Sequence, residues 1–506
     1  MGIIARQSIR GTIVTYLGVA VGFVTTFFVI TRFLTAEDIG LARVLIDAAT
    51  LFIGLAQLGT NASILRFYPY FVDNRESGEG SRDEHGFFFW TMVVPMVGFL
   101  LVALLFMVCY APLSVWFGEK SPLFVNYYYF VLPLAFFMLY QTVFETNANV
   151  RMHIVVPRAV RELLTRVGLL AVYLLYAFDV LTMDGFVWSL IGVYALAALC
   201  NAVYLFSLGN ISLKPDWDYL RRNTSLVRKY VLYTAFLVLS AVVSVLAPTL
   251  SSFFITAEMG LSYTGIFAIA TYMAVMVSIP YRSLTAIASP QLSMAIKRGD
   301  RAEAGTLLAQ VSGNLLLVGG LILAVIWVNI DVIFAILPNG ATYAVARRTV
   351  LLLGVAQLLV ATFQFALTAL SYSRFYPFSL LFSFILTATA LVLNNLLIPR
   401  WGMDGASVAT LAANAIYFAL AVITIHWVLG FRIFTRRHLL TILLLTVLFV
   451  LNSLCLRWVP VANIWLSSLM RSMLIVAAAW LAYRWQLSPE LNDLIHDKLS
   501  SFNHRP

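Results

Sequence analysis

The chain has 506 residues, of which 61% are hydrophobic and only 11% are charged, with a net charge of +10. Soluble domains are about 45–50% apolar and about 25% charged, so this chain has too little polar surface for a water-soluble fold of its size. The positive charge does not indicate nucleic-acid binding, because cytoplasmic loops of membrane proteins are rich in Lys and Arg. The cysteines lack the spacing of metal ligands or of a disulfide framework, and we interpret them as small apolar residues: Cys109, Cys200 and Cys455.

Long apolar stretches recur from Ile9 to Trp485. In lipid only helices and closed barrels satisfy the backbone, and a helix needs about 20 apolar residues to cross. Barrel strands alternate polar and apolar residues, whereas these stretches are apolar on all faces. The sequence therefore predicts an all-α polytopic membrane protein with about fourteen transmembrane helices. They are expected at residues 9–33, 39–67, 86–110, 122–146, 155–179, 183–208, 228–256, 261–288, 305–334, 347–373, 375–398, 403–430, 437–458 and 463–485.

The distribution of Lys and Arg predicts the orientation. With the N-terminus inside, about three quarters of the 33 Lys and Arg residues fall on inner segments, as cytoplasmic loops require. The alternation holds only for an even number of spans, so both termini are expected in the cytoplasm. The first apolar stretch is too long for the core of a signal peptide, and we interpret it as the first span.

Two short connections resemble each other and predict an internal repeat. Residues Leu34–Gly40 join the first two helices, and Ile255–Gly260 join the seventh and eighth. Aligning Thr256 with Thr35 gives an offset of 221 residues, which is close to six helices. Each connection follows a long apolar helix that begins after basic residues, so the two halves run in the same direction. Transporters built from such repeats usually hold their substrate between the halves.

The repeat predicts the domain organisation. Residues 1–208 form an N-lobe of six helices, and residues 230–430 form a C-lobe of six more. Between them, residues 209–229 form a polar, basic linker on the cytoplasmic surface. Residues 431–506 add two helices and a cytoplasmic tail. The longest connections, at 71–86, 209–229 and 290–305, are too short for a separate soluble domain.

Ionisable residues within the spans are candidates for ion coupling, because each costs about 2.5–3.5 kcal/mol at the membrane midplane. Arg43 and Asp47 lie four residues apart on the second helix. Either Asp47 is a cation or proton site or part of a cavity wall, or the two residues neutralise each other on one helix face. Glu145 either lines the cavity or faces inner water. The fifth helix is expected to begin with a salt-bridged face formed by Arg158, Glu162 and Arg166.

Several arginines are candidates for substrate binding, because guanidinium groups hold phosphate through a planar fork of donors. Arg282 is the strongest candidate, since it follows Pro280 in an otherwise apolar helix. The alternative for each arginine is ordinary anchoring at the cytoplasmic interface. The cavity set near the inner helix ends is Arg10, Arg66, Arg282 and Arg374, with Arg43 on the second helix as a further member.

The sequence has no glycine-rich nucleotide-binding loop, and its histidines are scattered without metal-ligand spacing. We therefore expect no cofactor, no metal, no nucleic-acid partner and no enzymatic activity.

Six segments together carry a family resemblance. In the first half they are Phe33–Gly40, Gln57–Ser63 and Arg66–Pro69, and in the second half Ala257–Gly260, Gly265–Phe267 and Ser289–Ser293. Over residues 5–430 the chain thereby resembles the polysaccharide and oligosaccharide flippases of the multidrug/oligosaccharidyl-lipid/polysaccharide exporter superfamily, a Wzx-like pattern. The resemblance implies movement of a polyprenyl-(pyro)phosphate-linked oligosaccharide from the inner to the outer leaflet of the bacterial inner membrane. Such a role serves polysaccharide biosynthesis, for example of the lipopolysaccharide O-antigen.

The partners implied by this resemblance are the lipid-linked oligosaccharide and membrane lipids, with contact to a glycan polymerase or other polysaccharide-assembly proteins compatible with it. Three alternatives stay open. A lipid II flippase also has cationic cavity residues. A multidrug/cation antiporter of the same superfamily tends to carry an acidic first-lobe site, although Ile9–Phe33 contains no carboxylate. A membrane-embedded glycan-modifying enzyme usually carries a large polar loop or a clustered His/Asp/Arg site, which this sequence lacks.

Overall fold

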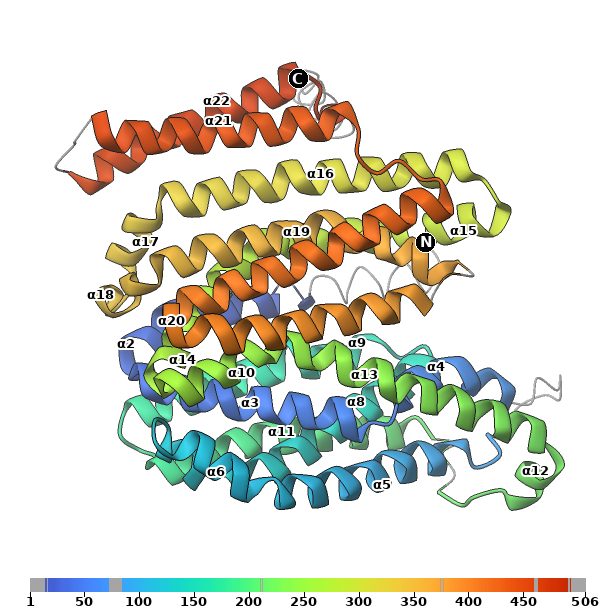
Figure 1. Cartoon of the computed structure of the whole chain (residues 1–506). Helices are drawn as coiled ribbons and strands as arrows, with labels where there is room; N and C mark the ends of the chain where they lie inside the picture. The colour runs from blue at the N-terminus through green and yellow to red at the C-terminus, as the bar shows by residue number, and fades with distance from the viewer. Residues whose placement is uncertain are drawn as a thin grey trace, which may run out of the picture. The chain divides into compact units, whose positions relative to one another are not determined.

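The protein is helical throughout the part of the chain that the computed structural model describes (Figure 1). The described residues are 14–15, 17–71, 84–209, 211, 213–373, 375, 377–458, 463–489 and 492. Among them, ten helices are long and apolar enough to cross a membrane, and two shorter apolar helices lie at Leu17–Phe33 and Val245–Met259. The predicted fold class, an all-α polytopic membrane protein, is confirmed, while the number of fourteen spans stays a prediction.

The chain packs as two compact units, Met1–Gly265 and Ile266–Pro506. The boundary lies within the helix Leu261–Val275, so the long helix after the predicted linker packs with the N-terminal helices. The division into an N-lobe, a linker and a C-lobe follows the repeat and stays a prediction.

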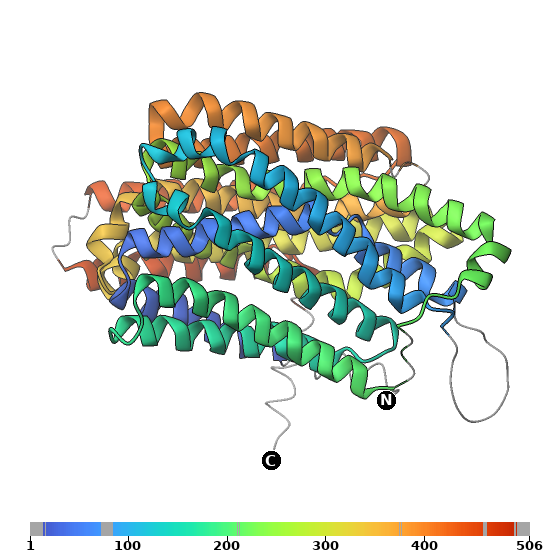
Figure 2. The same cartoon turned by 90° about the horizontal axis from the view of Figure 1, so that it is seen from below.

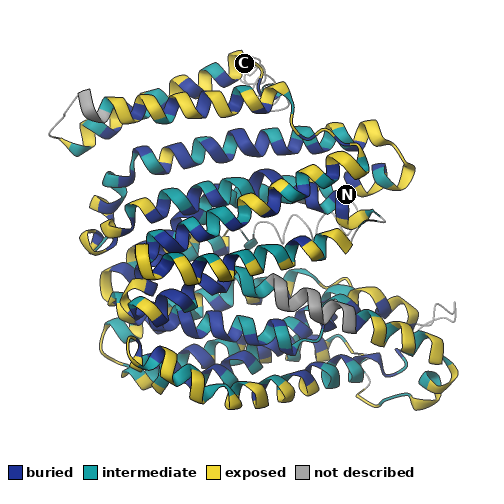
Figure 3. Cartoon of the chain, in the orientation of Figure 1, coloured by how far each residue is buried: buried dark blue, intermediate teal, exposed yellow. Residues whose placement is uncertain are grey.

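In unit 1, α3 is the central helix, because it packs against α5, α8 and α13 and buries most of its side chains (Figure 3). Helix α11 packs against α8 and also against α10, and the three helices can be followed in Figure 1 and, by their colours, in Figure 2. The elements are η1 (Thr25–Ile30), α2 (Thr31–Phe33), α3 (Ala36–Ala56), α4 (Thr60–Phe71), α5 (Phe87–Val108), α6 (Tyr110–Gly118), α7 (Pro122–Asn126), η2 (Tyr128–Phe130), α8 (Val131–Val150), α9 (Val155–Ala159), η3 (Val160–Leu164), α10 (Thr165–Ala177), α11 (Met183–Ser207), α12 (Trp217–Arg222), α13 (Thr224–Met259) and the start of α14 (Leu261–Val275).

In unit 2, α16 is the central helix and packs against α15, α19, α21 and α22. Gly402 has a φ of 58° inside α20, and this left-handed residue divides α20 into two helices, as the predicted spans 375–398 and 403–430 require. The elements after α14 are η4 (Met276–Ser278), α15 (Ile279–Arg298), α16 (Arg301–Val328), α17 (Ile330–Ile336), α18 (Gly340–Tyr343), η5 (Ala344–Ala346), α19 (Arg347–Tyr372), α20 (Pro377–Thr424), η6 (Ile425–Leu429), α21 (Arg436–Trp458) and α22 (Ile464–Arg484).

The expected connection at 290–305 is wrong. Helix α15 continues through Pro290 to Arg298, and Gly299 ends it with a φ of 76°. Asp300 then caps α16 by accepting a hydrogen bond of 2.9 Å from the Glu303 N–H. Proline removes one backbone donor and often kinks a helix, but it does not end one whose following turn stays hydrogen-bonded.

The structure also changes the alignment of the repeat. A Cβ atom added to Gly40 would lie 1.9 Å from the Leu261 carbonyl oxygen, and one added to Gly265 would lie 1.9 Å from the Ala36 carbonyl oxygen. These contacts are reciprocal at an offset of 225 residues, from Ala36 to Leu261 and from Gly40 to Gly265. This separation differs from the predicted offset of 221 residues by about one helical turn, and the repeat itself stays a prediction. Thr256 lies inside α13, whereas Thr35 caps α3.

Candidate functional site

The first helix approaches the fifth predicted span unusually closely. A Cβ atom on Gly18 would lie 2.4 Å from the Glu162 carbonyl oxygen, and one on Gly22 would lie 2.5 Å from Arg166 Nη1. The two glycines form a G-x-x-x-G pattern, which lets helix backbones approach each other in membranes. This signal is present in the sequence, although our prediction of the site did not use it.

The partner of the first helix begins with an irregular turn. Residues Val160–Leu164 form the π-helix η3, and the Thr165 hydroxyl donates a hydrogen bond of 3.1 Å to the Val160 carbonyl. A π turn contains an extra residue and often marks a functional site. Here it carries the neighbouring charged residues Arg161 and Glu162. No feature of the sequence indicated this turn.

Four charged side chains from α8, η3 and α10 form one network, which we call the unit 1 charge cluster: Glu145, Arg161, Glu162 and Arg166. Arg161 Nη1 lies 2.8 Å from Glu145 Oε1, and Arg161 Nε lies 3.4 Å from Glu162 Oε1. Arg166 Nη2 lies 3.0 Å from Glu162 Oε2, and its Nη1 donates a hydrogen bond of 2.8 Å to the Gly18 carbonyl. The cluster thus joins three elements of the helical bundle.

The two carboxylates of this cluster are buried, and the two guanidinium groups lie at its edge. The side chains of Glu145 and Glu162 are 8% and 12% exposed, whereas those of Arg161 and Arg166 are 47% and 31% exposed. Carboxylates with so little contact with water are stable as ions only when they are paired, so each arginine compensates a largely desolvated charge. The accessible surface of the cluster is therefore cationic, although its formal charges balance.

The predicted candidate Glu145 belongs to this cluster, about 7 Å from the C-terminal end of α8 at about 1.5 Å per residue. Its partner Arg161 was not among our candidates. The expected salt-bridged face at the start of the fifth span is present between Glu162 and Arg166. The roles of these residues in transport stay predictions.

The candidates Arg43 and Asp47 form an ion pair on α3, with 2.8 Å between Arg43 Nε and Asp47 Oδ2. Their side chains are 22% and 9% exposed. This geometry agrees with the expectation that the two residues neutralise each other on one helix face. The alternative, in which Asp47 binds a cation or a proton, requires Arg43 to move away first.

Of the other arginines predicted to bind substrate, two lie in the described part of the chain, and both of these are exposed. The Arg66 side chain is exposed on α4, and its guanidinium carbon lies 4.2 Å from the centre of the Tyr233 ring, a cation–π contact. Arg282 is exposed on α15 of unit 2. Arg10 and Arg374 lie outside the described residues. The convergence of these arginines around one opening therefore stays a prediction.

Sequence reasoning also missed a buried ion pair that fixes the end of α8. Arg151 Nε donates to Glu84 Oε1 at 2.9 Å, and the Tyr68 hydroxyl donates to the same oxygen at 3.0 Å. Arg151 Nη1 donates to the Asn147 carbonyl at 2.8 Å. Glu84 lies in a polar, charged stretch of sequence, and nothing in that stretch indicates that it is 5% exposed.

The segment around α12 docks beside the start of α5. His85 Nδ1 lies 3.1 Å from Asp216 Oδ2, and the His85 ring stacks on Tyr219 at 4.1 Å. Hydrogen bonds from the Tyr219 backbone N–H and from His85 lower the pKa of the Asp216 carboxyl from its ordinary value. Among the described residues, no three His, Cys, Asp or Glu side chains gather as metal ligands.

Comparisons with known proteins place this geometry in context. The profile of the polysaccharide biosynthesis protein family matches residues 4–296. The solved structure of the lipid II flippase MurJ in an inward closed conformation matches 94% of this chain and 99% of that chain, with a TM-score of 0.66 and 12% identity. No curated protein sequence matches this chain.

Two further solved structures have the same fold. An inward-facing multidrug resistance MATE family transporter of the MOP superfamily matches 80% of this chain and 94% of its own, with a TM-score of 0.61 and 13% identity. A MOP superfamily transporter from Pyrococcus furiosus matches 84% of this chain and 96% of its own, with a TM-score of 0.56 and 13% identity. At these identities the likeness shows the fold alone.

Proposed function

The chain belongs to the polysaccharide biosynthesis protein family, and we propose that it moves a polyprenyl-(pyro)phosphate-linked oligosaccharide from the cytoplasmic to the outer leaflet of the bacterial inner membrane. One observation carries the proposal. A chain of this family has, over 94% of its length, the fold of a lipid flippase. The proposed mechanism is alternating access, in which the sugar-phosphate headgroup crosses through the protein and the polyprenyl tail stays in lipid.

The unit 1 charge cluster supplies chemistry for an anionic headgroup. Glu145 and Glu162 hold two nitrogens of Arg161, and the side chain of Arg161 is nevertheless 47% exposed. Phosphate oxygens accept strong, charge-assisted hydrogen bonds from such a guanidinium group. The paired carboxylates fix its orientation in advance, which reduces the entropic cost of binding. In this mechanism Arg161 binds the phosphate, and the sequence-predicted candidates Arg66, Arg282, Arg10 and Arg374 provide further contacts to the anionic headgroup during its passage.

The same contacts offer a route to ion coupling. A phosphate that draws Arg161 away from Glu145 leaves a buried carboxylate without its partner, which is unfavourable. Glu145 would then take up a proton or a cation, and Asp47 would do so if Arg43 moved away. Coupling is not required by energetics, because each negative charge moved outward gains about 2.3 kcal/mol per 100 mV of an inside-negative potential.

The proposal is tested by leaflet exchange in proteoliposomes. A fluorescent lipid-linked oligosaccharide is added, and its accessibility to a membrane-impermeant quencher is followed over time. Wild-type protein is expected to speed exchange, and Arg161→Ala to slow it by about tenfold or more, since charge-assisted hydrogen bonds contribute about 1.5–3 kcal/mol. Arg222→Ala, which removes an exposed arginine from α12, is the control and should exchange normally. Absence of exchange by the wild-type protein with every lipid-linked oligosaccharide would refute the proposal.

A lipid II flippase is the second candidate, because 99% of the chain of the solved lipid II flippase can be superposed on this protein. Lipid II in the same assay distinguishes the two substrates by their relative rates. A multidrug/cation antiporter is less well supported, since Leu17–Phe33, the described part of the first helix, contains no carboxylate. A membrane-embedded glycan-modifying enzyme would change the mass of the substrate, whereas a flippase returns it unchanged in mass spectrometry.

A further inference from the structure

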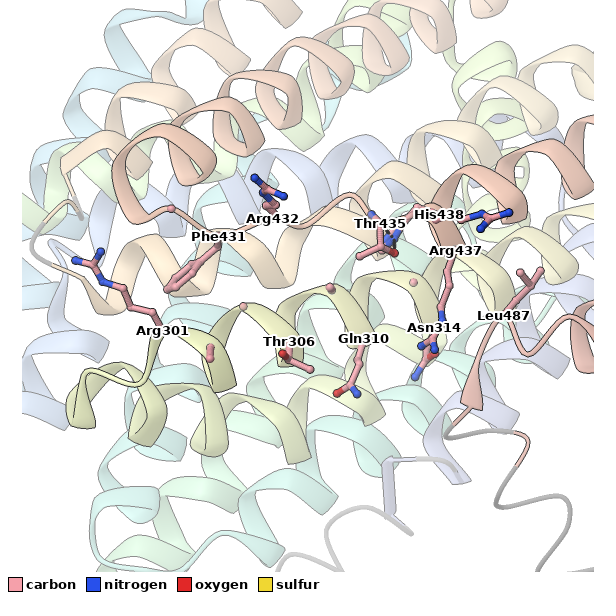
Figure 4. A pocket seen from close by; sticks show the side chains of 16 residues that line it. Arg301, Thr306, Gln310, Asn314, Phe431, Arg432, Thr435, Arg437, His438 and Leu487 are labelled. Atoms are coloured by element: carbon pink, nitrogen blue, oxygen red, sulfur yellow. Dashed lines mark hydrogen bonds between the residues drawn. The ribbon is translucent and has the colours of Figure 1, made fainter.

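Unit 2 contains a pocket that the proposed function does not use. It has a volume of about 580 Å³ and lies between α16 and the segment that leads from η6 into α21 (Figure 4). Thr306, Gln310 and Asn314 form a row along one wall, and Arg301 lies at one end of this row. We call this cavity the α16–α21 pocket.

The pattern of residues on α16 explains why the pocket is open. Gly305, Ala309 and Gly313 recur every fourth residue, so they lie on one helix face and leave room beside it. A Cβ atom on Gly305 would lie 3.6 Å from Phe431 Cδ1, and one on Gly313 would lie 3.4 Å from His438 Cε1. The polar row of Thr306, Gln310 and Asn314 follows the same spacing one residue later. This face of α16 therefore provides both an open cavity and side chains that can form hydrogen bonds to a ligand.

The opposite wall is held in place by specific contacts. His438 Nε2 lies 3.3 Å from the Ser312 hydroxyl on α16, and His438 Nδ1 lies 2.8 Å from the Thr435 hydroxyl. Phe431 and Ile433 are 7% and 2% exposed and pack into the core of unit 2. The wall is therefore formed before any ligand binds.

The pocket is strongly cationic. Among the described residues, its lining includes four exposed arginines and no acidic side chain. The two acidic side chains at the start of α16 have other partners: Asp300 accepts a hydrogen bond from the Glu303 N–H, and Glu303 lies 3.5 Å from Arg298. Neither residue lines the pocket. Within the part of the chain that the structure describes, no carboxylate lies within 4.0 Å of these four guanidinium groups, namely Arg301, Arg432, Arg436 and Arg437. Such uncompensated charge attracts an anion.

Neighbouring side chains indicate the level of the membrane interface. Trp427 is 83% exposed just before the pocket segment, and Trp485 is 47% exposed just before the lining residue Leu487. Exposed tryptophans concentrate where lipid headgroups meet the hydrocarbon. Leu439 and Leu443 are 65% and 56% exposed on the following turns of α21, so an apolar surface continues from the pocket along that helix.

We propose that the α16–α21 pocket binds the phosphate headgroup of an anionic phospholipid from the surrounding bilayer. The guanidinium groups hold the phosphate oxygens, and the polar row on α16 holds the hydroxyl or carbonyl groups of the headgroup. The acyl chains lie along Leu439 and Leu443. This apolar surface beside the arginines favours a lipid over free phosphate, and basic pockets between membrane helices are known to bind anionic headgroups. The proposal does not depend on the transport function.

Native mass spectrometry of the full-length protein in detergent tests this proposal, with titration of phosphatidylglycerol and, in parallel, phosphatidylcholine. The wild-type protein is expected to bind phosphatidylglycerol at least about tenfold more tightly than phosphatidylcholine. Arg436→Gln together with Arg437→Gln should weaken phosphatidylglycerol binding by about tenfold or more. The matched control is Arg221→Gln with Arg222→Gln, which removes the same charge from exposed positions on α12 and should leave binding unchanged.

A second variant, Thr306→Trp, fills the pocket from an exposed position on α16 without changing the charge, and it should weaken binding to a similar extent. Equal weakening by the α12 control, or unchanged binding in both pocket variants, would show that the lipid is held by general surface charge and would overturn the proposal. Displacement of phosphatidylglycerol from wild-type protein by millimolar inorganic phosphate would show that the pocket takes free phosphate, and would overturn the assignment to lipid.

Discussion

The arginines of the two units are compensated in opposite ways. In the unit 1 charge cluster, Arg161 and Arg166 lie against buried carboxylates of the protein itself. In the α16–α21 pocket, the lining includes four arginines and no carboxylate. The difference follows from position, since a charge within the bundle must bring its own counter-ion, whereas one at the interface can meet water or a lipid phosphate.

The sharpest test of this comparison removes the carboxylate that two arginines share. Glu162→Gln leaves Arg161 and Arg166 with one fewer counter-ion. Both guanidinium groups keep contact with water and Arg161 keeps Glu145, so we expect a loss of about 1.5–3 kcal/mol in the free energy of unfolding. Arg437→Gln in the pocket breaks no ion pair with a described residue and should cost less than about 0.5 kcal/mol. Denaturant titration of the purified protein in detergent measures both values. Equal losses of unfolding free energy in the two variants would contradict the idea that the two sets of arginines are compensated differently.

A second test displaces the first helix from the unit 1 charge cluster. Gly18→Ala places a Cβ atom 2.4 Å from the Glu162 carbonyl oxygen, so the first helix must shift. We expect a loss of about 1–3 kcal/mol, as for other overpacked positions. Gly192→Ala on α11 is the control, because no atom lies within 4 Å of its added Cβ. Stability retained in Gly18→Ala would mean that the close approach does not constrain the cluster.

Substitutions in the Arg43–Asp47 pair test the same comparison, with an expected loss of stability of similar size. Arg43→Leu leaves Asp47 buried without its partner, and we expect a loss of about 1–3 kcal/mol. Adding Asp47→Leu should recover most of it, because two apolar residues replace a pair of charges. A double-mutant cycle on unfolding free energies gives the coupling. If the double variant is as unstable as Arg43→Leu, the pair is not simply self-neutralising.

The smallest expected effect is a pH dependence of the contact between the α12 segment and the start of α5. The pKa of Asp216 is lower in the folded protein than its ordinary value of 3.8. The ionised carboxylate therefore stabilises docking of the α12 segment fully at pH values above 3.8. This contribution is lost as the pH falls through the pKa of the folded protein. Asp216→Asn should remove this dependence. Tryptophan fluorescence between pH 6 and 3, compared for the two proteins, reports it through Trp217, which packs against Trp90 at 5.4 Å. Identical profiles would mean that docking is independent of Asp216.

Much of the fold could be read from the sequence, and the site only in part. The apolar stretches predicted the helices, and Gly402 lies between two predicted spans. The candidate Glu145 was found because it is a charge in a span, whereas its partner Arg161 was not distinguished from other arginines near helix ends. A pairing across helices has no fixed spacing in the sequence, and the π turn that presents Arg161 has no composition of its own.

The sequence by itself determined that this chain is a multi-pass helical membrane protein, while the parallel repeat that it predicts stays a prediction. The cost of burying polar groups in hydrocarbon leaves a chain of this composition no other fold class. Only the tertiary structure decided which charges meet, that Gly40 and Gly265 lie against each other's helices, and which arginines have no carboxylate partner among the described residues. These outcomes depend on the packing of helices far apart in the chain, because close backbone approach and ion pairing are set by three-dimensional neighbours.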